Sequence, residues 1–147
     1  MTTLEPTPTF EERIWGCFLG VLRWPQLEAL WERVASQPEG WYLYDLAGDP
    51  PSQPLAAPEL RSFLRRMNKR LRREHEYDYC GIVYADNMHQ PSMVKIYDPG
   101  NLGAVCGPSG GRVLPRWVMS RMQPTALRDY SAVASPPLRW WQRLLGV

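Results

Sequence analysis

Cysteine and histidine are scarce in this chain of 147 residues, which has three cysteines and two histidines. The cysteines stand at positions 17, 80 and 106 and form no C-x-x-C pair. Their odd number and their spacing indicate neither a disulfide scaffold nor a zinc finger. The first residues also lack the basic and apolar regions of a secretory signal. We therefore expect reduced thiols in a cytoplasmic protein.

Long apolar runs are missing as well. The stretch from Ile14 to Leu22 is far shorter than the roughly 20 residues that cross a bilayer, so no transmembrane segment is expected. Lysine occurs only at Lys69 and Lys95, and every other basic side chain is arginine. The formal net charge of +2 is too small to create a global field that would attract nucleic acid.

The composition that is present favours a globular protein. Hydrophobic residues make up 44% and charged residues 22% of the chain, and seven Trp and seven Tyr supply bulky core material. The length suits one domain. We expect a flexible arm over residues 1–8, one domain over 9–130 and a tail over 131–147 that forms a short amphipathic helix.

Three helices are predicted. A capping box at Thr9–Glu12 starts the first, whose apolar residues continue at helical spacing to Leu22. Pro25 is expected to kink or divide it, and the second helix ends near Ser36. The third begins at Pro58. Its apolar residues form one stripe, namely Leu60, Phe63, Leu64, Met67 and Leu71.

Four segments have strand character: residues 41–46, 77–85, 92–98 and 112–120. The second and third are expected to form an antiparallel hairpin, and Pro115 is expected to mark an edge or a bulge in the last. The predicted fold class is α+β. It has two layers, with a small, mainly antiparallel sheet of three or four strands covered on one face by about three helices.

The third helix carries the most prominent charge pattern. Its basic residues are Arg61, Arg65, Arg66, Lys69, Arg70, Arg72 and Arg73. They are either a solvated face, paired in part with the acidic N-terminal helices, or a binding face for an acidic partner. Nucleic acid is the weaker alternative, because Phe63 points inward and no nucleic-acid-binding module is recognisable.

A second candidate site is Cys106, in the glycine-rich segment 103–111. Backbone N–H groups in such a loop can bind an anion and lower a thiol pKa. The only histidines are His75 and His89, and neither has a fixed relation to Cys106. Cys80, Cys106, His75 and His89 are also of the types that ligate zinc. Their spacing matches no known zinc motif, so an ordinary thiol in a loop is the simpler interpretation.

Two further features carry weaker hypotheses. Asp45, Asp78, Asp86 and Asp98 lie at strand ends, where aspartate usually forms turns. In the tail, Trp140 and Trp141 share a predicted helical face. That face packs on its own domain, fills a groove on a partner or inserts into a membrane interface.

The interpretation that these patterns favour is a small, non-enzymatic cytoplasmic protein of bacterial type. It would bind an acidic protein partner through the basic helix and the Trp-rich tail, as an adaptor, regulator or accessory factor. No cofactor, metal or catalytic residue is expected. The first alternative is a thiol-dependent enzyme or redox sensor that uses Cys106, and the second is nucleic-acid binding by the basic helix.

Overall fold

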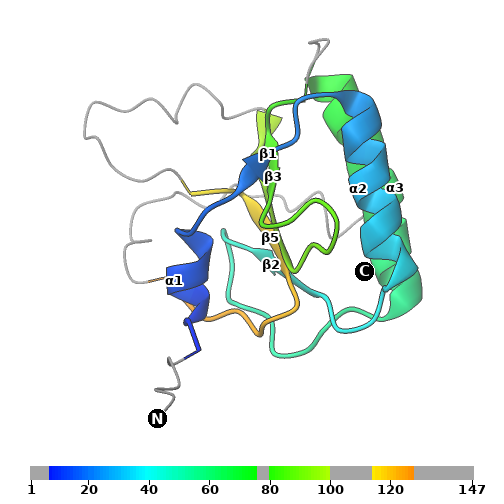
Figure 1. The fold of residues 1–147 in the computed structure, drawn as a ribbon. Helices are drawn as coiled ribbons and strands as arrows, with labels where there is room; N and C mark the ends of the chain where they lie inside the picture. Colours follow the sequence, from blue (N-terminus) through cyan, green and yellow to red (C-terminus); the bar gives the residue numbers. More distant parts are fainter. Residues whose placement is uncertain (1–6, 76–79, 100–113, 128–147) are drawn as a thin grey trace.

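Three helices and a five-stranded sheet make up the computed structural model, which describes residues 7–75, 80–99 and 114–127 (Figure 1). The elements in chain order are α1 (Phe10–Ile14), β1 (Leu19–Gly20), α2 (Trp24–Ser36), β2 (Tyr42–Asp45), α3 (Ala57–Glu74), β3 (Val83–Ala85), β4 (Met93–Ile96) and β5 (Trp117–Ser120). The predicted α+β class is confirmed.

The strands lie in the order β1-β3-β4-β5-β2, and every neighbouring pair is antiparallel. The predicted hairpin is β3 and β4, with Val83 opposite Ile96. The predicted count of three or four strands is wrong, since the sheet has five. Pro115 does not mark an edge strand, because β5 lies between β4 and β2. Pro115 lies just before the hydrogen bonds that join β5 to β4. The first of these runs from the Arg116 N–H to the Ile96 carbonyl at 3.0 Å.

The fifth strand is β1, which occupies part of the segment predicted as the first helix. As predicted, the Thr9 hydroxyl caps the start of α1 by accepting the Glu12 N–H at 3.1 Å. The helix ends at Ile14, and Leu19–Gly20 then pairs with β3. Glycine costs about 1 kcal/mol in a helix relative to alanine, so Gly16 and Gly20 weaken the helix while sheet pairing stabilises the alternative.

Pro25 does not divide a long helix but lies in the first turn of α2, which begins at Trp24. A proline there loses no intrahelical hydrogen bond. The Gln26 side chain accepts the Arg23 backbone N–H at 3.0 Å, which fixes the entry of the chain into the helix. The end of α2 at Ser36 is as predicted.

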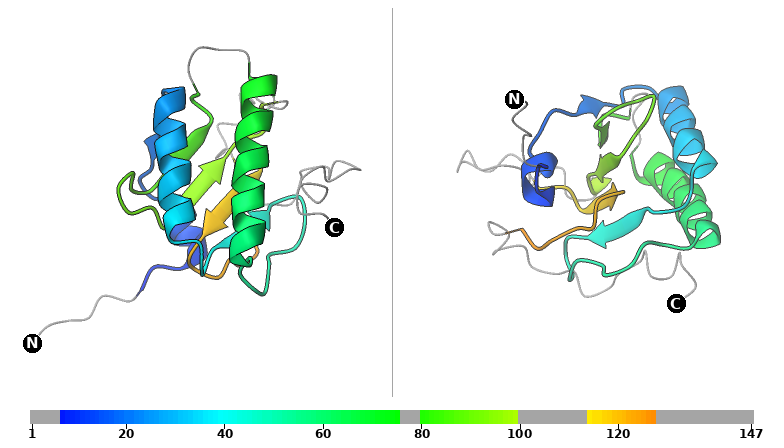
Figure 2. Two further views of the ribbon diagram at one scale, coloured as in Figure 1. Left: turned by 90° about the vertical axis from the view of Figure 1, so that its right-hand side faces the viewer. Right: turned by 60° about the horizontal axis from the view of Figure 1, so that its bottom comes forward.

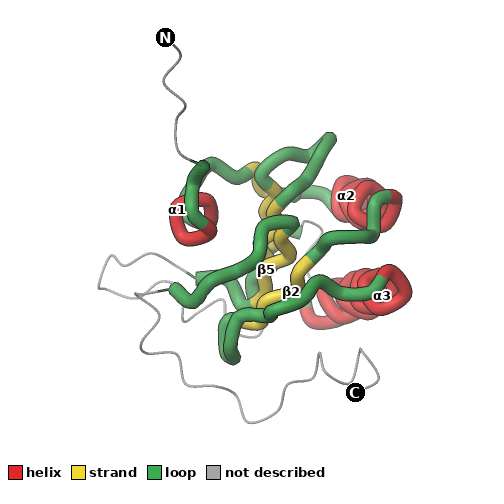
Figure 3. The backbone as a smooth tube through the Cα atoms, turned by 90° about the horizontal axis from the view of Figure 1, so that it is seen from below, coloured by secondary structure: helices red, strands yellow, loops and turns green. Residues whose placement is uncertain are grey.

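Two apolar clusters lie on opposite faces of the sheet (Figures 2 and 3). On one face, α2 and α3 cover Val94 and Ile96 of β4. On the other, α1 lies in a smaller cluster with Met93 of β4 and Val118 of β5. The expectation that about three helices cover one face is therefore corrected to two, with α1 on the opposite side.

The third helix has the predicted inward face. Its buried residues are Leu60, Phe63, Leu64, Met67 and Leu71, and Pro58 lies in its first turn as expected. Because one continuous stripe faces the sheet, the basic residues between its members are directed toward α2 or toward solvent.

Several predictions fall on residues outside the described ranges. They concern Cys106, Asp78, Trp140, Trp141, the first residues of the arm and the tail over 131–147. Among the described helices, none is both long and apolar enough to cross a membrane.

Candidate functional site on the outer face of α2 and α3

Four of the predicted basic residues form a row along the solvent side of α3, here called the α3 cation row: Arg61, Arg65, Lys69 and Arg73. All four are exposed, and each is four positions from the next. Within the described ranges, none of their side chains has an ion pair or a hydrogen bond. Like charges at i, i+4 destabilise a helix by a few tenths of a kcal/mol per pair.

The other cations of α3 are placed differently. Arg70 pairs with Glu74 at 3.0 Å, and its burial lowers its pKa. Arg72 pairs with Glu28 of α2 at 2.6 Å and lies 5.2 Å from the centre of the Trp24 ring. Arg66 is exposed. Pairing with the acidic N-terminal helices therefore neutralises Arg72 and leaves the α3 cation row unpaired within the described chain.

A groove of about 370 Å³ runs between α2 and α3 beside the row. Its lining residues are Glu28, Trp31, Glu32, Ala35, Arg61, Leu64, Arg65 and Asn68. The floor is apolar. Its two walls carry opposite charges, because the acidic residues come from α2 and the basic ones from α3. This α2/α3 groove shares Arg61 and Arg65 with the cation row.

Two residues that line the groove each carry a buried polar atom with no hydrogen-bond partner among the described residues: Trp31 Nε1, a donor, and Asn68 Oδ1, an acceptor. Trp31 is only 6% exposed. Buried polar groups are nearly always hydrogen-bonded, and leaving one unsatisfied costs about 1–3 kcal/mol. The walls of the groove thus include two residues with unsatisfied buried atoms, a donor on Trp31 of α2 and an acceptor on Asn68 of α3.

Sequence reasoning missed the α2 side of this site. Trp31 belongs to the apolar stripe of α2, and that pattern predicts a core residue without showing its indole N–H unpaired. The available signal was Asn68, an uncharged amide inside the basic run. Its meaning depends on how closely α2 approaches α3, which periodicity within one helix does not fix.

The thiol and metal candidates receive no support from the described residues. Cys80 is buried, and this burial raises its pKa, so its reactive thiolate form is suppressed at neutral pH. His75 is buried against the Trp24 ring, whereas His89 is exposed. No group of three or more His, Cys, Asp or Glu side chains within the described part of the chain could hold a metal ion.

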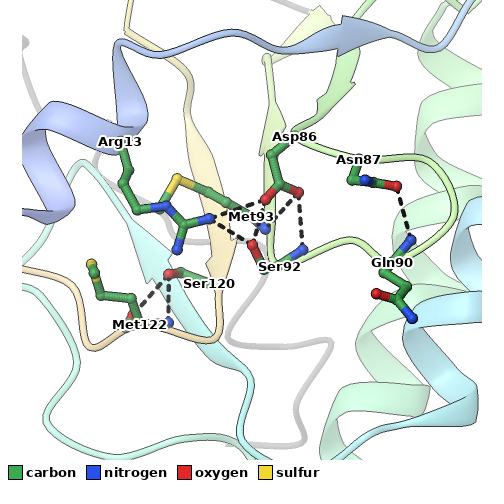
Figure 4. A network of polar contacts seen from close by, with 8 residues as sticks. All are labelled: Arg13, Asp86, Asn87, Gln90, Ser92, Met93, Ser120 and Met122. Atoms are coloured by element: carbon green, nitrogen blue, oxygen red, sulfur yellow. Dashed lines mark hydrogen bonds and ion pairs between the residues drawn. The ribbon is translucent and has the colours of Figure 1, made fainter. Parts of the chain in front are cut away.

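The strand-end aspartates that lie in the described ranges have structural partners. Asp86 accepts the Ser92 N–H at 2.9 Å and the Met93 N–H at 3.1 Å, which closes the β3–β4 connection. Arg13 of α1 reaches Asp86 at 3.0 Å and Ser92 Oγ at 2.6 Å (Figure 4). The Ser92 hydroxyl also donates to Asp86. This network connects α1 to the sheet, and the Asp86 carboxylate accepts hydrogen bonds from all of these donors, which indicates a structural role.

Lys95 of β4 is buried on the face of the sheet that α1 covers. Its Nζ donates to the Ile14 carbonyl at 3.0 Å and lies 3.9 Å from the centre of the Phe18 ring. Ile14 is the last residue of α1, so the ammonium group caps the negative end of that helix. Burial lowers the pKa of Lys95.

This lowered pKa predicts a pH effect on stability. Between the folded pKa and the ordinary value of 10.5, the unfolded chain binds a proton that the folded chain does not, so stability rises with pH. We expect the unfolding free energy of wild type minus that of Lys95→Met to increase from neutral pH toward about pH 10. Urea titrations of both proteins at each pH measure this difference. The subtraction cancels the contribution of tyrosine ionisation, which both proteins share. A difference that does not change with pH contradicts the prediction.

No protein-family model, curated protein or solved structure matches this chain.

Proposed function

We propose that this protein binds an acidic protein partner through the outer face of α2 and α3 and acts as a non-enzymatic adaptor, regulator or accessory factor. The observation that carries the proposal is the α3 cation row, whose four side chains are exposed and unpaired within the described ranges. A self-repelling row lowers the stability of its own helix. An acidic segment laid along α3 would remove that repulsion.

The setting of the row favours a protein over nucleic acid. Single-stranded nucleic acid is usually bound by cations interleaved with exposed aromatic rings on which bases stack. On α3 the aromatic residue is Phe63, which is fully buried. Beside the row lies an apolar groove, a feature that suits an amphipathic protein segment.

Charge reversal tests this function directly. We expect the variant with Arg61, Arg65, Lys69 and Arg73 all changed to Glu to bind acidic peptides about 10- to 1000-fold more weakly. Each exposed ion pair contributes about 0.2–1 kcal/mol. The probe is a display library of random peptides, from which the wild-type protein should enrich acidic sequences. Fluorescence anisotropy then gives the affinity of an enriched peptide for both proteins.

The control, which reverses half as many charges, changes Arg23 and Arg33 to Glu. Both are exposed residues of α2 or its N-terminal cap, so the net charge moves in the same direction without touching the row. Binding by this control should stay close to wild type. Equal peptide binding by wild type and the α3 variant would contradict the proposal. Tight, strongly salt-dependent binding of random oligonucleotides with no enrichment of acidic peptides would replace it with nucleic-acid recognition.

A further inference from the structure

We infer that the α2/α3 groove recognises one apolar side chain together with a neighbouring amide group of the bound acidic segment. The cation row would then select the charge of the partner, and the groove would select its sequence. This inference rests on the proposed function, since it names the chemistry that the same face requires beyond negative charge.

The unsatisfied pair of atoms points to an amide. Trp31 Nε1 needs an acceptor and Asn68 Oδ1 needs a donor. A carboxamide of Asn or Gln, or a peptide group, presents one C=O and one N–H on the same small planar unit. A carboxylate could satisfy Trp31 but would offer Asn68 no donor. Both atoms are shielded from water, so a ligand reaches them only when side chains that line the groove, such as that of the exposed Glu32, change rotamer.

The size of the groove limits what enters it. At about 370 Å³ it is at the small end of the range for ligand sites, which is about 300–1,000 Å³. Trp31 and Leu64, on its floor, are buried apolar residues. One apolar side chain and an adjacent amide therefore suit the space better than a large cofactor does.

Charge complementarity fixes the kind of occupant and its orientation. The α3 wall carries Arg61 and Arg65, which continue into the cation row, while the α2 wall carries Glu28 and Glu32. A segment in the groove would therefore direct its carboxylates toward α3 and neutral or basic side chains toward α2. The occupant is an amphipathic acidic segment of another protein, with its apolar anchor between the two walls.

Peptide selection separates this inference from the proposed function. We expect peptides enriched by the wild-type protein to be acidic and also to share a large apolar residue with a nearby Asn or Gln. Acidic peptides with no such shared residues would overturn the groove inference and leave the proposed function standing. Failure to enrich acidic peptides would overturn both.

Two conservative variants test the atoms themselves. Trp31→Phe removes only the indole donor and ring edge, and Asn68→Leu removes the amide while retaining a good helix former. Each should weaken binding of an enriched peptide by about tenfold, the usual effect of one hydrogen bond to a buried group. The Arg23/Arg33 control should not.

Thermal unfolding without peptide provides an independent readout. Because each variant removes an unsatisfied atom, the Tm of Asn68→Leu should stay level or rise by up to about 8 °C. If Asn68→Leu instead loses stability, Asn68 Oδ1 has a hydrogen-bond partner in solution and the inference is overturned. Sedimentation gives the last check. A dimer of the wild-type protein that Arg65→Glu dissociates would assign the groove to a second copy of the chain and overturn the inference as well.

Discussion

Replacing Asp45 by alanine should lower the free energy of unfolding by about 3–5 kcal/mol. Asp45 is only 4% exposed, and its carboxylate receives Arg116 Nε at 2.8 Å and Arg116 Nη2 at 3.2 Å. The same carboxylate accepts the Ala47 N–H at 2.9 Å. Alanine would leave the buried guanidinium without its counter-charge. The total free energy of unfolding of a small domain is about 5–15 kcal/mol, so a loss of this size will be clear in urea unfolding.

Two further variants identify the cause of that loss. Asp45→Asn keeps one oxygen for the Ala47 N–H and Arg116 Nε but removes the charge and the second acceptor, which receives Arg116 Nη2, so its effect should be smaller than that of alanine. The double change Asp45→Leu with Arg116→Met should recover much of the stability, because a buried ion pair is often replaceable by apolar side chains of similar size. A double variant as unstable as Asp45→Ala would show that the aspartate acts mainly through the turn at Ala47.

Phe63→Ala should be comparably destabilising, by about 3–5 kcal/mol. The ring is fully buried between α3 and the sheet, in the same cluster as Leu30 and Val94. Truncation removes most of the side chain from the most completely covered part of the molecule. The cavity that remains adds to the lost transfer free energy, since packed surroundings relax only in part. Calorimetry or urea unfolding measures the change.

Charge reversal on the opposite side of α3 is the control for the Phe63→Ala variant. Charge reversal of the α3 cation row alters only exposed side chains, and surface changes usually shift stability by about 0.5 kcal/mol or less each. Phe63→Ala should therefore reduce stability without removing the peptide-binding residues, while the reversed row should lose binding and keep the fold. A row variant that unfolds like Phe63→Ala would mean that these arginines stabilise the domain itself.

The parts of the fold that sequence predicts well are those with long, unambiguous periodicity. The apolar stripe of α3 runs through five buried residues, so the existence of the helix and its inward face follow from helical spacing, while Pro58 indicates where it begins. The segment from Ile14 to Leu22 also matches helical spacing. It is interrupted by glycines, however, and pairing with β3 decides its structure. A strand of two residues, such as β1, is too short for any period to reveal.

The candidate site likewise has one part that sequence predicts and one part that it does not. The cation row is predictable because Arg65, Lys69 and Arg73 lie four positions apart on the side opposite the stripe, and Arg61 lies at its flank. Nothing in the sequence shows which cation meets Glu28, and the structure selects Arg72. The groove exists only where α2 lies against α3, so its lining and its two unsatisfied atoms depend on packing between segments that sequence patterns treat separately.

The position of β2 in the sheet has a consequence for how the protein is made. This edge strand is synthesised early, but its only neighbour among the described strands of the sheet is β5. Tyr42 therefore cannot pair until Ser120 has been synthesised. Contacts between such distant segments slow folding, because a long loop must close before they form. On the ribosome, α2, β2 and α3 emerge while the strand that completes the sheet is still untranslated. Until Trp117–Ser120 leaves the exit tunnel, the apolar faces of α2 and α3 have no complete sheet to pack against. Chaperones can bind these exposed apolar faces during that interval.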